Sequence, residues 1–296
     1  MANYSIKDLE NFTGIKAHTI RIWEKRYNVV EPKRTDTNIR YYDDEDLKKL
    51  LNVSILNRHG FKISNIANFT DKALCEKVMS LSQTNNDVES QIEGLVLAMI
   101  DLDEYKFDKI FNNAVINFGF EETIVKIIYP FFQKIGILWL IGTINPAQEH
   151  FISNLLRQKL IVAIDGIVEN ITANSKTFLI FLPEGEYHEL GLLFSYYLIK
   201  KQHHKVYYLG ESVPYEALSL TSSIRKFDYV LTSVVTSKTK DELTAFVNQL
   251  SDIFPESTIY ITGNQSRSLQ DNVPENIKSI SNIEILKKEI SRISVS

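Results

Sequence analysis

Glu186, His188 and Gly191 lie within one short segment, Glu-Tyr-His-Glu-Leu-Gly, whose residue types suit metal binding. A histidine binds a metal through one ring nitrogen while its other nitrogen donates a hydrogen bond to a carboxylate, here that of Glu186. A single histidine does not hold zinc, because a structural zinc site takes four protein ligands. The metal must therefore arrive with most of its ligands in place, as cobalt does in a corrin ring and iron does in a haem.

The elements around this segment alternate between strand and helix. Apolar strands are expected at 177–182, 205–209, 229–234 and 258–262, and helices at 192–201, 215–226 and 240–253. This alternation predicts a Rossmann-like domain over residues 176–296, with a doubly wound parallel sheet. His188 falls in the loop after the first strand, and such sheets bind ligands at the carboxyl ends of their strands.

The region 86–172 is predicted to form a four-helix bundle. Apolar side chains recur at helical spacing between Val88 and Phe132, and few glycines interrupt them. Asn145 and Pro146 then suit the N-cap and the first residue of a further helix.

Trp139, Glu149 and His150 are further candidates for ligand contact. Trp139 follows a Gly-Ile-Leu stretch at 136–138 that is interpreted as a turn, and a loop at 142–146 comes after it. Glu149 and His150 fall in the first turns of the helix that follows. By residue type alone, Trp139 is a core residue and the Glu-His pair lies at the surface.

The N-terminal segment 5–27 predicts two short helices joined by a glycine-containing turn. The first spans 5–13, with Ser5 as its cap and Gly14 at its end. The second spans 17–27 and places Ile20, Trp23 and Tyr27 on one face. Its other face carries basic and hydroxyl side chains, which are Lys16, His18, Thr19, Arg21 and Lys25. This arrangement is typical of a recognition helix that enters the major groove of DNA.

A two-stranded wing is expected next, with strands near 29–30 and 39–42 around a polar turn. Arg34, Arg40 and the Tyr42 hydroxyl are predicted to reach DNA phosphates. These elements are assigned to a first domain of residues 1–72. Polar residues at 70–72 and 82–86 indicate a linker to the bundle.

Charge is unevenly distributed along the chain. Residues 1–70 hold seven lysines and five arginines against nine acidic residues, a formal charge of +3, so the rest of this −4 chain carries −7. A pI near 5.9 excludes a protein that coats nucleic acid by bulk charge, so any such contact is local. Cys75 is the single cysteine, which excludes an intrachain disulfide. With no signal-peptide pattern and no membrane-spanning apolar run, a cytoplasmic protein without membrane contact is expected.

The predicted N-terminal domain, 1–72, resembles the MerR family of winged-helix regulators. The resemblance rests on Thr-Ile-Arg-Ile-Trp-Glu-Lys-Arg-Tyr at 19–27, Pro-x-Arg at 32–34 and Arg-Tyr-Tyr at 40–42. It implies that the second helix reads double-stranded operator DNA and that the wing clamps the backbone. The residues implied in DNA binding are Lys16, His18, Thr19, Arg21, Arg34, Arg40 and Tyr42.

The predicted C-terminal domain, 176–296, resembles the cobalamin-binding domain of methionine synthases and mutases. That family's pattern is D-x-H-x-x-G, a long spacer, S-x-L, a shorter spacer, then G-G. Here the three parts are Glu186 to Gly191, Ser-Val-Val at 233–235 and Gly263-Asn264, and the spacers 192–232 and 236–262 match those of the family closely. The resemblance implies that His188 is the lower cobalt ligand with Glu186 as its partner. It also implies that Gly191, Ser233 and Gly263 line the path of the nucleotide tail, which Asn264 would narrow.

The whole arrangement resembles MerR-type cobalamin photoreceptors of the CarH class. Those proteins carry Glu at the position of Glu186 and a W-x9-E-H motif, matched here by Trp139, Glu149 and His150. The resemblance implies a repressor that self-associates as a dimer or tetramer, whose bundle covers the adenosyl face of adenosylcobalamin and which light controls by breaking the cobalt–carbon bond. Leu140 stands where the photoreceptors place a histidine that captures cobalt after photolysis, so a bis-histidine product is not expected.

Two other functions fit parts of the sequence. A regulator of the same architecture would sense another ligand or a partner protein, without cobalamin or without photochemistry. An enzyme of methyl transfer or isomerisation is the weaker alternative, because no substrate domain remains and an enzyme has no use for Arg21, Arg34 and Arg40. The sequence therefore predicts a regulator that is not an enzyme.

Overall fold

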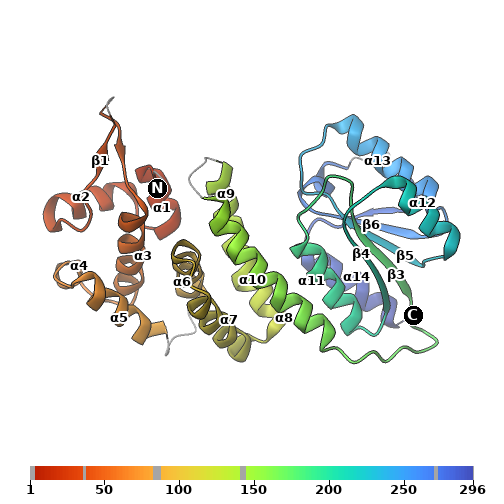
Figure 1. Ribbon diagram of the computed structural model, residues 1–296, viewed down its shortest axis with the longest axis horizontal. Coiled ribbons are helices and arrows are strands. Elements are labelled where there is room, and N and C mark those ends of the chain that lie inside the picture. Colours follow the sequence, from red (N-terminus) through yellow and green to blue (C-terminus); the bar gives the residue numbers. More distant parts are fainter. Residues whose placement is uncertain (1–3, 36–37, 83–87, 141–144, 270–272, 296) are drawn as a thin grey trace. The chain divides into compact units, whose positions relative to one another are not determined.

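The computed structural model describes residues 4–35, 38–82, 88–140, 145–269 and 273–295 (Figure 1). The chain forms two units, Met1–Ile152 and Ser153–Ser296. Helices and a small wing make up the first unit, and a parallel sheet with flanking helices makes up most of the second. The expected fold class is confirmed. Among the described residues, no helix is long and apolar enough to cross a membrane.

The head, defined here as α1 to α5, is a winged helix-turn-helix (Figure 1). Its elements are α1 (Ile6–Thr13), α2 (Ala17–Tyr27), β1 (Lys33–Arg34), β2 (Arg40–Tyr41), α3 (Asp44–Arg58), α4 (Ile63–Ile66) and α5 (Asp71–Ser82). Ser5 begins α1 through a capping box with Asp8, and Gly14 ends it at a φ of 70°, which glycine adopts without steric cost. Ile20 and Trp23 of α2 are buried, as their spacing predicts.

The strands of the wing pair closer to its turn than the sequence predicts. The expected strand at 29–30 is wrong, because Val29 and Val30 are buried side chains of the head core. The antiparallel pairing instead places Arg34 directly opposite Arg40. The wing is therefore a short ribbon in which two arginines face each other.

The polar stretch at 70–72, expected as a linker, begins a helix. The Thr70 hydroxyl accepts a hydrogen bond from the Ala73 amide at 3.2 Å. Leu74 and Val78 of α5 are buried, and α5 packs against α3. Polar residues cap helices as readily as they form loops, so polarity alone does not separate the two cases.

Five helices and a π-helical turn follow the head. They are α6 (Val88–Asp101), α7 (Glu104–Phe118), α8 (Phe120–Thr123), η1 (Ile124–Ile128), α9 (Tyr129–Leu140) and α10 (Pro146–Asp165). Asn145 caps α10 as predicted, because its side-chain oxygen accepts a hydrogen bond from the Ala147 amide at 3.0 Å. The turn expected at 136–138 is wrong, since these residues continue α9. Residues 141–144 of the expected loop lie outside the described residues.

The π-helical turn η1 has a local cause in the sequence. Pro130, the second residue of α9, has no N–H to donate to the carbonyl of Lys126, and its ring crowds that carbonyl. The chain widens by one residue before the proline, so that the Tyr129 amide bonds to the Ile124 carbonyl. Such bulges often mark functional helices, and this one leads into the helix that carries Trp139.

The second unit holds a five-stranded parallel sheet of order β4-β3-β5-β6-β7. Its elements are β3 (Thr177–Pro183), α11 (Leu190–Lys201), β4 (Lys205–Val213), α12 (Tyr215–Ile224), β5 (Tyr229–Ser233), α13 (Lys240–Ile253), β6 (Thr258–Thr262), η2 (Asn264–Ser268), β7 (Ile277–Ser279) and α14 (Ile283–Val295). The strand order reverses between β3 and β5, as in doubly wound sheets. The predicted sheet is confirmed. The apolar-run criterion does not predict the short strand β7.

Helices cover both faces of the sheet (Figure 1). Leu218 of α12 and Phe246 of α13 join Phe181 and Val230 of the strands in one buried apolar cluster. On the other face, α11 contacts β3, β5 and α14. Because both faces are covered, the loops at the strand ends are the part of the sheet open to a ligand.

Candidate functional site: a histidine loop at the sheet and a basic reading head

His188 lies in the loop between β3 and α11, and its imidazole is held by Glu186. Nδ1 of His188 is 2.5 Å from Oε1 of Glu186. The side chain of His188 is 63% exposed, whereas that of Glu186 is 2% exposed. The buried carboxylate therefore orients an exposed imidazole ring through Nδ1.

The Glu186 carboxylate also joins two strand ends. Oε2 accepts hydrogen bonds from the amides of Val235 and Thr236, which follow β5, at 2.9 and 2.8 Å. β3 and β5 are neighbours where the strand order reverses, which is the position at which doubly wound sheets bind ligands. Burial by itself raises the pKa of Glu186, but the hydrogen bonds from His188 and from these amides hold that pKa well below its usual range. The carboxylate is therefore ionised and accepts from the His188 ring.

Ser233 and Gly263 bring the ends of β5 and β6 close together. A Cβ atom on Gly263 would lie 2.4 Å from the Val234 carbonyl oxygen and 2.9 Å from the Ser233 hydroxyl, and the φ of Gly263 is 90°. Only glycine permits both the approach and this backbone conformation. Gly191 differs, because a Cβ atom there would meet nothing within 4 Å. Its small size is therefore not needed for packing among the described residues.

Glu189, next to His188, is a functional candidate that no sequence motif marks. Arg157 Nε of α10 lies 2.6 Å from its Oε2, and the Tyr208 hydroxyl of β4 donates to its Oε1. The Glu189 carbonyl also accepts from the Leu193 amide in the first turn of α11. The His188 loop is thus anchored at both ends, by Glu186 to the end of β5 and by Glu189 to α10 and β4.

We expect Arg157→Met to destabilise the second unit by about 1–2 kcal/mol, because a buried acceptor loses its charged donor. The Glu189 side chain is 9% exposed, but Arg157 is half exposed, which keeps the effect below that of a fully buried pair. The midpoint of the urea unfolding transition measures the change. Arg157→Lys, which keeps the positive charge, should lose less, and an unshifted midpoint in Arg157→Met would show that the pair contributes nothing.

Glu149 and His150 fall at the start of α10, as predicted. Glu149 Oε2 lies 3.5 Å from His150 Nδ1, and the two side chains are 29% and 71% exposed. Trp139 belongs to α9, but its side chain lies outside the described residues. Contact of these three residues with a cofactor stays a prediction.

The face of α2 opposite its buried residues is polar. His18 and Arg21 are exposed, and Thr19 is half-buried. Lys16, whose side chain is 70% exposed, pairs with Glu10 of α1 at 2.9 Å. The side chains of this surface include hydrogen-bond donors that can contact base edges and phosphates.

Arg34 and Arg40 face each other across the wing, and both are exposed. Arg34 Nη1 donates to Asn38 Oδ1, a neutral acceptor, at 2.7 Å. Like charges directly opposite in an antiparallel pair repel each other. An anion bound at the wing, such as a phosphate, would relieve this repulsion.

Tyr42 does not lie where the predicted phosphate contact needs it. Its side chain is fully buried, and its hydroxyl donates a hydrogen bond to Glu24 of α2. Burial and this hydrogen bond raise the pKa of Tyr42. A small head gains more from burying a large ring than from exposing it. Tyr42 therefore supports α2 from the core side.

The donors around His188 fit a metal that brings its own ligands. Within the part of the chain that the structure describes, no group of three or more His, Cys, Asp or Glu side chains could hold a metal ion. One exposed imidazole with a buried carboxylate behind it supplies a single nitrogen ligand. This suits a macrocycle-bound metal, and the geometry alone does not separate a corrinoid from a haem.

Two family matches resolve that choice. Residues 4–73 match the MerR HTH family of regulatory proteins, and residues 91–163, which span the bundle, match the B12 binding domain. The chain therefore joins a MerR HTH segment to a B12-binding segment, which fits a MerR-family regulator that binds cobalamin.

Two relatives of known name align with this chain over most of their length. The HTH-type transcriptional repressor CarH of Myxococcus xanthus is 25% identical over 274 residues, which cover 90% of this chain and 91% of that protein. The repressor CarA of the same organism is 24% identical over 249 residues, which cover 83% and 81%. Both are named as transcriptional repressors, in agreement with the prediction of a regulator that is not an enzyme.

A solved structure shares the fold. The monomethylamine corrinoid protein of Methanosarcina barkeri matches with a TM-score of 0.54 and 13% identity, over 70% of this chain and 100% of that one. At this identity the likeness shows the fold alone.

Proposed function

We propose that this protein is a DNA-binding transcriptional repressor whose binding to double-stranded operator DNA is controlled by adenosylcobalamin. The observation that carries the proposal is the hydrogen bond between Glu186 and His188 at the switch point of the sheet. The same chain exposes Arg21, Arg34 and Arg40 in its head. An imidazole oriented for cobalt has no use in DNA binding alone, and a basic recognition helix has no use in corrinoid chemistry alone.

On the sheet side, we assign His188 as the lower cobalt ligand and Glu186 as its hydrogen-bond partner. Ser233 and Gly263, which lie against each other, line the path of the nucleotide tail together with Gly191. Asn264 replaces the second glycine of the family pattern, and its side chain is exposed. The exposed position of Asn264 supports a path for the nucleotide tail of the cofactor that the asparagine side chain does not fill.

On the opposite face of the cofactor, Trp139, Glu149 and His150 are proposed to contact the adenosyl group. The exposure of the Glu149 and His150 side chains, 29% and 71%, supports this role, because a ligand can reach both from solvent. When bound, adenosylcobalamin supplies a cobalt–carbon bond that light breaks. Leu140, in the place of a cobalt-capturing histidine, favours a second version in which a corrinoid controls the protein without photochemistry.

Self-association is proposed because each head offers only a small basic surface. Several heads on one dimer or tetramer raise the effective concentration at repeated operator sites. Binding should then weaken steeply with salt, since each phosphate contact releases counterions.

Size-exclusion chromatography in darkness and after green illumination tests the proposal. The dark, adenosylcobalamin-loaded chain should elute as an assembly that binds a DNA fragment selected by it from a random pool. After complete photolysis, the elution volume should increase and DNA binding should fall. Protein loaded with hydroxocobalamin, which carries no adenosyl group, is the control and should not respond to light.

Two results would contradict parts of this proposal. Unchanged elution after complete photolysis, with the corrinoid still bound, would exclude the light switch and leave the non-photochemical version. Purified protein mixed with adenosylcobalamin in darkness that retains no corrinoid absorbance would exclude cobalamin binding itself.

A further inference from the structure

Glu93 of α6 is a buried carboxylate that belongs neither to the histidine loop nor to the DNA-reading surface. Its side chain is 0% exposed, and glutamate is rarely buried unless it is paired. Its partner is Arg58, the last residue of α3. Arg58 Nη1 lies 2.8 Å from Oε1 of Glu93, and Nη2 contacts Oε2. A bidentate ion pair of this kind fixes the relative orientation of the two helices that carry it, which are α3 of the head and α6 of the bundle.

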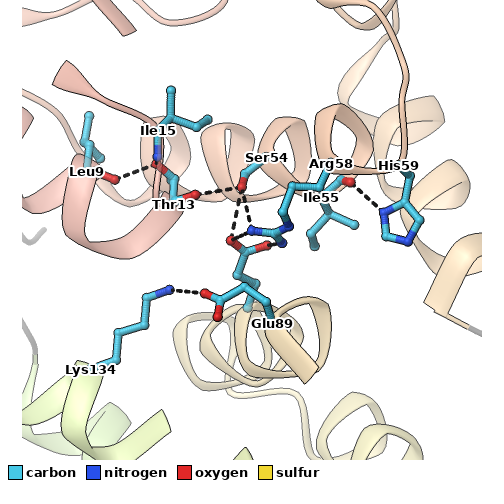
Figure 2. Close-up of polar contacts among 10 residues, drawn as sticks. Leu9, Thr13, Ile15, Ser54, Ile55, Arg58, His59, Glu89 and Lys134 are labelled. Carbon is cyan, nitrogen blue, oxygen red and sulfur yellow. Dashed lines mark hydrogen bonds and ion pairs between the residues drawn. The ribbon is translucent and has the colours of Figure 1, made fainter. Parts of the chain in front are cut away.

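Ser54 extends this pair to the end of α1 (Figure 2). Its hydroxyl lies 2.8 Å from the Thr13 carbonyl oxygen and 3.1 Å from Oε1 of Glu93. Thr13 is the last residue of α1, and the last carbonyls of a helix have no partner within it. A hydroxyl donates a single proton, so the Thr13 carbonyl and the Glu93 carboxylate compete for it. The state of Glu93 therefore affects the cap of α1.

The end of α1 in turn fixes the start of α2. The Ile15 amide donates to the Thr13 hydroxyl at 3.2 Å (Figure 2). The Ala17 amide, at the first position of α2, donates to Oε2 of Glu10 at 3.0 Å. The Lys16 side chain makes no cap of its own, so α1 supplies the cap of α2. A displacement of Thr13 therefore displaces the recognition helix.

On its other side, α6 is tied to α9. Lys134 of α9 lies 3.3 Å from Glu89, which is one turn before Glu93 on α6 (Figure 2). α9 is also the helix that carries Trp139. Polar contacts thus link α9 to Glu89 of α6, and Glu93, one turn further along α6, to α3 and the turn that precedes α2.

We propose that Glu93 is a positioning residue for the DNA-reading helix, which it holds from the bundle through Ser54 and the end of α1. A change in the bundle then alters the placement of α2. The attribution of that change to the cofactor rests on the proposed function, whereas the positioning itself does not. The pair adds little net stability, because the desolvation of the buried Glu93 carboxylate offsets much of its attraction to Arg58, whose side chain is 32% exposed. Burial indeed raises the pKa of Glu93 even with Arg58 in contact.

Glu93→Gln tests the proposal, since it keeps the shape of the side chain and removes its charge. In the 296-residue chain free of DNA, amide hydrogen exchange over residues 13–19 should become about fivefold faster, and the Kd for the selected DNA fragment should rise about fivefold. Ser54→Ala should act in the same direction. The matched control is Lys48→Met, which removes the 2.6 Å ion pair between Lys48 and Asp101 that joins the same two helices away from Ser54. Exchange over 13–19 should not change in that control.

The double variant Glu93→Leu with Arg58→Met separates positioning from stability. Apolar replacement of both partners leaves no unpaired buried charge, so the thermal midpoint should stay near the wild-type value while exchange stays fast and DNA binding stays weak. If the double variant showed wild-type hydrogen exchange and DNA affinity along with the wild-type thermal midpoint, the proposal would be overturned. Wild-type exchange and affinity in Glu93→Gln would also overturn it.

A comparison of DNA binding with and without adenosylcobalamin keeps this inference distinct from the proposed function. The ratio of DNA affinities with and without adenosylcobalamin should move toward one in Glu93→Gln. If that ratio is already one in the wild type, the proposed cofactor control fails, and exchange and affinity in the apo chain still decide the role of Glu93.

Discussion

His188→Ala is expected to lose bound adenosylcobalamin, with a rise in Kd of about 100-fold or more. The imidazole is the protein ligand that we assign to cobalt, and even the loss of an outer partner of a metal-bound histidine costs about 10–100-fold in affinity. Titration of the protein into adenosylcobalamin in darkness, followed by corrinoid absorbance, measures the effect. Unchanged retention in His188→Ala would show that cobalt ligation is not needed for binding.

The matched control is His203→Asn. His203 is an exposed histidine of the same sheet domain, and its φ of 61° is a left-handed conformation that asparagine tolerates. The variant removes an imidazole without strain, so cofactor affinity should stay at the wild-type value. A loss in this control as well would indicate general damage to the domain.

Glu186→Gln examines the buried partner of His188. It should weaken cofactor binding by about 10–100-fold, because the neutral amide no longer polarises the ring. The folded chain lowers the pKa of Glu186 from 4.5, so the ionised carboxylate stabilises the fold at neutral pH. That contribution is lost as the pH falls below 4.5 toward the folded value. In Glu186→Gln, the unfolding midpoint should therefore fall less steeply with acid than in the wild type.

The features that the sequence predicts well are those decided by neighbours along the chain. Gly14 ends α1 because its backbone conformation favours glycine, and Asn145 and Pro146 begin α10 because of the cap that they form. Glu186 and His188 are two residues apart, so their hydrogen bond needs only the loop itself. For the same reason, the local hydrophobic pattern is enough to predict the central strands of the sheet.

The features that cannot be predicted from the sequence depend on partners far along the chain. Glu189 is 32 residues from Arg157 and 19 from Tyr208, and Glu93 is 35 from Arg58. A glutamate on a helix is usually exposed, and no linear pattern distinguishes the one that a distant arginine will bury. Tyr42 is a residue whose predicted phosphate contact is wrong, because a tyrosine suits both a phosphate contact and a buried core position. Only tertiary packing decides between them.

Loss of the wing arginines should weaken DNA binding equally on all sequences. Arg34→Ala and Arg40→Ala are each expected to lower the slope of log Kd against log salt by about 1 per bound head, because each removes one phosphate contact. A filter-binding or anisotropy titration over a range of salt concentrations measures the slope. Lys226→Gln is the control, since this lysine of the sheet domain is 79% exposed and its loss changes the charge equally. A slope that falls as much in the control would show that net charge, not the wing, sets the salt dependence.

Arg21→Ala should act differently, because Arg21 lies on the exposed face of α2 and not on the wing. A side chain that reads a base edge contributes about 1–3 kcal/mol to the discrimination between fragments. We therefore expect the preference for the selected fragment over random DNA to fall about 5- to 150-fold in Arg21→Ala. The wing variants should retain that preference, since phosphate contacts carry no sequence information. Equal weakening on both DNAs in Arg21→Ala, with an altered preference in the wing variants, would reverse the roles assigned to α2 and the wing.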